Sequence, residues 1–100
     1  MSIEEIKQMY DEFVADHDGK TPAVVEVEIK WKDTEETEEC IMSLDDTYTD
    51  ETDDDARETD IGILSEDDIF FHVESLENLC ALFENSDGED FEITDIAGFY

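Results

Sequence analysis

Basic residues are the scarcest feature of this chain. Of its 100 residues, five are Lys or Arg and 33 are Asp or Glu, which gives a formal net charge of −28. No Lys or Arg follows Arg57. Such a charge repels nucleic acid and anionic membranes and attracts basic proteins and cations. It also far exceeds the net charge of about 2–8 that keeps a small domain soluble, so the acidity indicates a role beyond solubility.

Cysteine and long apolar runs are scarce as well. Cys40 and Cys80 each lie in an apolar pattern without the spacing of a disulfide framework, so we expect two reduced thiols in the core of a cytoplasmic protein. The opening sequence MSIEEIKQMY has neither the basic nor the apolar region of a secretory signal, and no apolar run approaches the length of a membrane span. Hydrophobic residues still make up 39% of the chain, which predicts one folded domain over residues 1–100.

Hydrophobic periodicity predicts the first two elements. Ser2 and Glu5 form a capping box before apolar residues at helical spacing, and Asp18 followed by Gly19 ends this helix. Apolar and charged residues then alternate over 23–32, which is typical of a half-buried strand.

The rest of the chain predicts four more strands and one more helix. The segment DTEETEE turns the chain into a second strand with Cys40, Met42 and Leu44 on one face. Two short strands at 61–63 and 69–73 flank the turn SEDD. Ser75 caps a helix that NSDG ends, and DFEITDIAGFY is a final strand.

This order of elements, helix, four strands, helix and strand, favours an α+β domain. We expect an antiparallel sheet of four to five strands with both helices packed on one face. The acidic segment between the second and third strands, residues 45–58, is expected to be a long loop.

The sequence contains no motif that indicates enzymatic catalysis or metal binding. His17 and His72 have no Ser or Cys partner at a meaningful spacing, carboxylate pairs are too numerous to single one out, and there is no Gly-rich phosphate loop. Near Gly19 and Gly88 the chain approaches an EF-hand pattern, but valine, phenylalanine or threonine occupies the end positions that need carboxylates. We therefore expect no enzyme, no cofactor and no dedicated metal site.

Rows of carboxylates are the candidate working surface. Acidic residues at i and i+2 on a strand lie about 6.6 Å apart, and DNA carries one charge per roughly 3.4 Å of axis on each strand, so such rows can imitate a phosphate backbone. Tyr48 can stack on a partner's arginine or pin the loop to the domain. The predicted partner-binding residues are Glu35, Glu36, Glu38, Glu39, Asp45, Asp46, Tyr48, Asp50, Glu51, Asp53, Asp54, Asp55, Glu66, Asp67 and Asp68. If the sheet is a meander, both turns and the end of the acidic loop can crowd one edge of it.

In its size and in the rows DTEETEE and DDTYTDETDDD, the chain resembles the small acidic DNA-mimic inhibitors of phages and mobile elements. Anti-CRISPR and anti-restriction proteins belong to this class. The resemblance implies an inhibitor that occupies the DNA site of a basic nucleic-acid-binding protein, such as a Cas effector or a restriction enzyme, in the bacterial cytoplasm. It implies no direct binding of nucleic acid or membrane, and a monomer or homodimer.

Three alternatives remain open at this stage. The acidity can be a halophilic adaptation, it can bind divalent cations weakly, or it can serve an adaptor for another basic protein.

Overall fold

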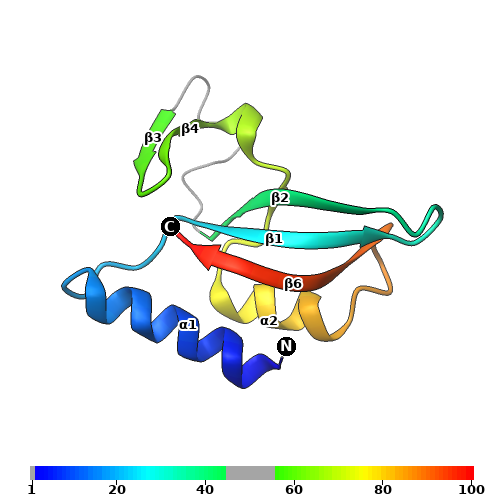
Figure 1. Cartoon of the computed structure of the whole chain (residues 1–100), viewed down its shortest axis with the longest axis horizontal. Coiled ribbons are helices and arrows are strands. Elements are labelled where there is room, and N and C mark those ends of the chain that lie inside the picture. The colour runs from blue at the N-terminus through cyan, green and yellow to red at the C-terminus, as the bar shows by residue number, and fades with distance from the viewer. Residues whose placement is uncertain (1, 45–55) are drawn as a thin grey trace.

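The computed structural model describes residues 2–44 and 56–100 of the chain (Figure 1). Within these ranges, two α-helices and a four-stranded sheet confirm the predicted α+β class. A separate two-stranded sheet and a short 3₁₀-helix complete the described structure. In chain order the elements are α1 (Ile3–Asp16), β1 (Val24–Trp31), β2 (Thr37–Ser43), β3 (Ala56–Thr59), β4 (Gly62–Ser65), η1 (Glu66–Asp68), β5 (Phe71–His72), α2 (Leu76–Glu84) and β6 (Phe91–Phe99).

Helix α1 begins where the capping box predicts. The Ser2 hydroxyl accepts a hydrogen bond from the backbone N–H of Glu5 at 3.3 Å, which satisfies one of the donors that a helix N-terminus leaves without a partner. The helix ends at Asp16, and Asp18 and Gly19 then turn the chain with φ angles of 55° and 87°. Glycine adopts such angles without a steric penalty, so the Asp-Gly pair ends the helix as predicted.

Helix α2 is capped in the same way. The Ser75 hydroxyl accepts a hydrogen bond from the Asn78 N–H at 3.1 Å. Leu79 and Cys80 are the buried residues of this helix. Ile6 is the fully buried residue of α1.

The main sheet has the strand order β5-β2-β1-β6. Strand β1 is antiparallel to both of its neighbours, so that Val27 lies opposite Cys40 of β2 and Ile96 of β6. Strand β6 contains extra residues at two points where its register with β1 shifts, between Glu26 and Val27 and between Glu28 and Ile29 of β1. These β-bulges bend β6 relative to its partner.

One hydrophobic core joins the sheet to both helices. Because the same face of the sheet and both helices contribute to this single cluster, the helices share one side of the sheet, as predicted. The buried members of the cluster are Ile6, Val25, Val27, Ile29, Met42, Leu44, Val73, Leu79, Cys80, Phe91, Ile93, Ile96 and Phe99.

Two predictions about the middle of the chain were wrong. The predicted loop 45–58 overlaps a strand, because Ala56–Thr59 forms β3 and pairs with β4 in an antiparallel ribbon, while residues 45–55 lie outside the described part of the chain. The strands expected on either side of SEDD are present as β4 and β5, and SEDD contains the 3₁₀-helix η1. Strand β5 runs parallel to β2 rather than antiparallel, with Met42 opposite Phe71, so the main sheet is not wholly antiparallel.

Both cysteines are free, as expected, with Cys80 buried and Cys40 half-buried. Burial, followed by the charge of Glu38, raises the pKa of the Cys40 thiol from 9.0 to about 12. Among the described residues, no helix combines the length and the apolar character that crossing a membrane requires.

Candidate acidic interface

The outer face of the main sheet, opposite the helices, carries charged side chains. Along β1, Val25, Val27 and Ile29 are buried in the core, while Glu26 and Glu28 alternate with them and project to the other face. This alternation follows from the pleat of a strand, on which successive side chains point to opposite faces.

Three carboxylates form a row across this face. Glu28 of β1 lies directly opposite Glu39 of β2 on one side and opposite Asp95 of β6 on the other. Neighbouring strands lie about 4.7–4.9 Å apart, so the three acids follow one another at about that spacing. We call Glu39, Glu28 and Asp95 the acidic row.

Hydrogen bonds fix two of the three carboxylates. The Thr94 hydroxyl lies 2.9 Å from Glu28 Oε1 and 3.1 Å from the Glu28 backbone carbonyl, both of which can accept its proton. Asp95 Oδ1 accepts a hydrogen bond from the Ile96 N–H at 2.9 Å. Thr94 is an extra residue at a β-bulge of β6, and the bulge therefore brings this hydroxyl to Glu28.

Cations do not neutralise the row. Lys30 lies on the same face, but its cross-strand neighbours are Thr37 and Glu92. Among the side chains that the structure describes, one ion pair is present, between His17 and Asp60. Glu39 and Asp95 are exposed and Glu28 is half-buried, and none of the three is paired with a described cation.

The predicted hairpin residues Glu35, Glu36, Glu38 and Glu39 separate into three settings. Glu35 and Glu36 are exposed in the turn between β1 and β2, and Glu35 has a φ angle of 59°. Glu38 and Glu39 belong to β2 rather than to the turn, which corrects the prediction. Glu38 accepts a hydrogen bond from Trp31 Nε1 at 3.0 Å, and Glu39 joins the acidic row.

The acids of η1 lie apart from the hairpin. Asp67 and Asp68 are exposed, and Asp68 Oδ2 accepts hydrogen bonds from the backbone N–H and the hydroxyl of Ser65 at 2.8 and 3.1 Å. The β1–β2 turn lies at the right-hand end of the molecule in Figure 1, while β3, β4 and η1 lie toward the upper left. The sheet is not a meander, and the two turns do not crowd one edge of it.

The remaining predicted residues lie outside the described part of the chain, and their place in a partner surface stays a prediction. They are Asp45, Asp46, Tyr48, Asp50, Glu51, Asp53, Asp54 and Asp55, together with the side chain of Glu66.

Sequence reasoning placed Glu28 on a polar face but left it and Asp95 out of the candidate surface. Alternation along β1 was the available signal for Glu28. Its alignment with Glu39 and Asp95 depends on the register of three strands and on the bulges of β6, which periodicity within one strand does not specify.

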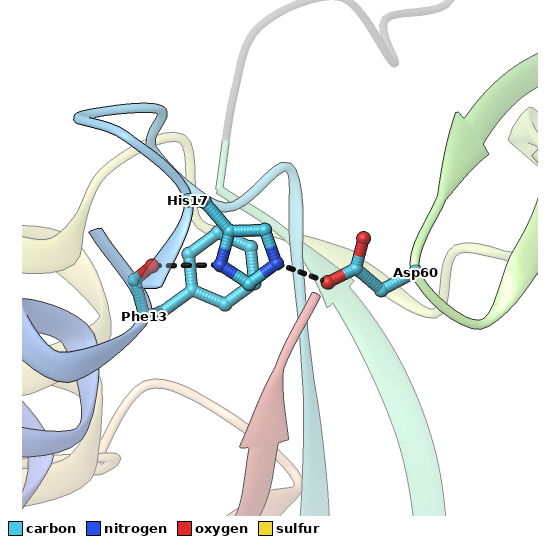
Figure 2. Close-up of polar contacts among 3 residues, drawn as sticks. All are labelled: Phe13, His17 and Asp60. Carbon is cyan, nitrogen blue, oxygen red and sulfur yellow. Dashed lines mark hydrogen bonds and ion pairs between the residues drawn. The ribbon is translucent and has the colours of Figure 1, made fainter. Parts of the chain in front are cut away.

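A second polar site lies at the C-terminal end of α1 (Figure 2). The His17 ring stacks on Phe13, with ring centroids 3.8 Å apart and an interplanar angle of 12°. Its Nδ1 lies 2.7 Å from the Phe13 carbonyl oxygen, and its Nε2 lies 2.5 Å from Asp60 Oδ2. The Phe13 carbonyl, and then Asp60, raise the pKa of His17 above its ordinary value of 6.5.

Among the described residues, no group of three or more His, Cys, Asp or Glu side chains could hold a metal ion. Comparisons with protein-family models, curated proteins and solved structures find no match to this chain.

Proposed function

We propose that this protein is a DNA mimic that inhibits a nucleic-acid-binding effector, such as a CRISPR–Cas complex or a restriction-type enzyme, by occupying its basic DNA-binding site. It acts in the bacterial cytoplasm without catalysis or cofactor. The observation that carries the proposal is the acidic row Glu39–Glu28–Asp95, in which like charges lie directly opposite one another across three strands.

The acidic row is unfavourable for the isolated protein. Like charges directly opposite each other destabilise a sheet, and a polar residue without charge would fill the same positions on the outer face without repulsion. Thr94 and the bulges of β6 hold the carboxylates in this arrangement. The cationic side chains of a basic partner would attract the same carboxylates that repel one another in the isolated protein.

The spacing of the row suits a protein that binds DNA. Carboxylates about 4.7–4.9 Å apart across the strands have a spacing of the same order as the charge spacing of about 3.4 Å per DNA strand. A groove lined with Lys and Arg would meet a comparable charge density on both ligands. It would release counterions from either, so binding should weaken steeply as salt increases.

The proposed surface is distributed over several segments. The acidic row supplies the part on the outer face, and the exposed turn of Glu35 and Glu36 extends it along the β1–β2 hairpin. The acidic residues of the segment 45–58 contribute further charge in this proposal. Single substitutions should therefore have modest effects, and block substitutions large ones.

Affinity capture tests the proposal. The immobilised protein is exposed to a bacterial lysate and eluted with a salt gradient that starts at about 0.15 M, where the screening length is about 8 Å. We expect a nucleic-acid-binding protein or complex that elutes at raised salt and is displaced by duplex DNA. Retention that duplex DNA cannot displace would contradict mimicry.

Matched variants locate the surface. The triple variant Glu28→Gln, Glu39→Gln, Asp95→Asn removes three charges from the acidic row. The control Glu4→Gln, Asp11→Asn, Glu12→Gln removes three from the exposed face of α1. We expect the row variant to elute at lower salt, with the slope of log affinity against log salt reduced by up to about 3, and the control to elute like the original protein.

A second block tests the acidic segment. Reversal of Asp50, Glu51, Asp53, Asp54 and Asp55 to Lys should abolish capture. If this block and the row variant both left capture unchanged, the acidic surface would not be the binding surface.

A further inference from the structure

The β3–β4 ribbon, residues 56–65, is weakly attached to the rest of the molecule. In the described part of the chain, β3 packs mainly against β4, and β4 against η1, with at most marginal contacts to the main sheet and the helices. Its apolar residues Ile61 and Ile63 remain 41% and 73% exposed. An isolated two-stranded hairpin is marginally stable in water, so the position of this ribbon depends on specific contacts.

One such contact joins the tip of the ribbon to α1. The turn between β3 and β4 is closed by a hydrogen bond of 2.9 Å from the Thr59 hydroxyl to the Gly62 carbonyl. Asp60 lies in this turn and reaches His17 at the end of α1, 43 residues away in sequence (Figure 2). At its other end, the chain rejoins the main sheet through the Phe70 N–H and the Ile41 carbonyl, 2.8 Å apart.

Only a charged histidine can donate to both of its partners at once. Both groups that face the ring nitrogens, the Phe13 carbonyl and the Asp60 carboxylate, are acceptors. A neutral imidazole has one N–H, whereas an imidazolium has two. Once the ring loses a proton, one nitrogen lone pair therefore faces an oxygen.

The surroundings of His17 favour the charged form. Asp16 precedes it on α1, Asp60 faces it from the ribbon, and a positive charge at a helix C-terminus is favourable. Lys20 and Tyr100 line the same cleft, which has a volume of about 460 Å³. The positive charge of Lys20 opposes the protonation of His17, but Lys20 is exposed to solvent.

We propose that His17 and Asp60 form a pH-dependent latch that holds the β3–β4 ribbon against the C-terminal end of α1. The latch is closed while His17 is protonated. Because the folded protein raises the pKa of His17, the contribution of the latch is complete below the ordinary histidine pKa of about 6.5 and is lost as pH rises through the raised value. This inference is independent of the proposed inhibitory function.

Nuclear magnetic resonance tests the latch on the intact chain. Backbone order parameters of residues 59–65 are measured at about pH 5.5 and about pH 9, on either side of the histidine titration. We expect values near about 0.85 at the lower pH and below about 0.6 at the higher pH, with β1 unchanged. Equal order parameters at both values would overturn the proposal.

Two variants with the same change of charge separate the latch from general electrostatics. Asp60→Ala removes the partner of His17, whereas Asp67→Ala removes an exposed carboxylate of η1. We expect Asp60→Ala to lower the pKa of His17 and to leave the ribbon mobile at both pH values, and Asp67→Ala to behave like the original protein. Identical titration of His17 in the two variants would contradict the latch.

A third variant isolates the role of the carboxylate. The amide of an asparagine can either accept from or donate to Nε2, so Asp60→Asn should make the order of the ribbon independent of pH. A pH dependence that persists in Asp60→Asn would also overturn the proposal.

Discussion

At the scale of single residues, repulsion between carboxylates is greatest on β1, because this strand has a neighbouring strand on each side. Glu28 has a carboxylate neighbour on each adjacent strand, whereas Glu92 lies opposite Lys30. The same residue type thus occupies a repulsive and an attractive position on one face of one sheet. This contrast provides an internal control for the effect of charge on stability.

We expect Glu28→Gln to raise the free energy of unfolding by about 0.2–1 kcal/mol, because it removes repulsion from two directions and leaves an oxygen that can accept from Thr94. Glu92→Gln should be neutral or destabilising. Urea unfolding at low salt measures both changes. The gain of Glu28→Gln should disappear near 1 M salt, where the screening length is about 3 Å, and a gain that persists there would have another origin.

The cysteines permit a second prediction at this scale. Burial raises the pKa of Cys40 to about 12 and also raises that of Cys80, so little reactive thiolate forms at neutral pH. We expect iodoacetamide at about pH 8 to alkylate the folded protein about 100-fold more slowly than the urea-unfolded chain. Equal rates in the folded and unfolded states would contradict this burial.

At the scale of elements, capping determines where the helices begin. Helix α2 has nine residues and is too short to be stable alone. Its last turn also contains no basic residue. Its N-terminus depends on the hydrogen bond from the Asn78 N–H to the Ser75 hydroxyl.

We expect Ser75→Ala to lower the free energy of unfolding by about 0.5–2 kcal/mol, because the Asn78 N–H loses its acceptor. Ser75→Asn, which keeps an acceptor without adding charge, should cost much less. Thermal or urea unfolding of both variants measures the difference. Equal losses would show that the cap contributes little.

The same elements show what local sequence can predict. The N-cap serines and the turn residues located both helices, and alternation located β1, β2 and β6, because these signals lie within each segment. The sequence ARET of β3 has no alternation, and residues 56–58 were therefore assigned to the acidic loop. The parallel pairing of the two-residue strand β5 with β2 depends on contacts distant in sequence, as does the alignment of Glu28 with Asp95.

At the scale of the whole molecule, the net charge of −28 dominates. Self-repulsion at this charge opposes compaction. The described residues contain a single ion pair, between His17 and Asp60, to offset it. Stability should therefore respond to ionic strength more than to any one surface contact.

We expect the melting temperature to rise as NaCl increases from about 0.01 to about 0.15 M, because the screening length falls from about 30 to about 8 Å. CaCl₂ at matched ionic strength should give a similar rise if the carboxylates act as a diffuse surface. An additional gain from millimolar Ca²⁺ would instead favour the cation-binding alternative. A requirement for molar NaCl would favour halophilic adaptation.

The two bulges of β6 have a consequence for self-association. Strand β6 is one of the two outer strands of the main sheet and spans nine residues, a length that could serve as a template for stacking identical chains. Irregular register disrupts the flat ladder that such stacking needs. In-register copies would also place Asp95 on Asp95 at every repeat of about 4.7–4.8 Å. The carboxylates and bulges that shape the outer face should thus keep this edge from nucleating fibrils, and acidification that protonates Asp95 would weaken that protection.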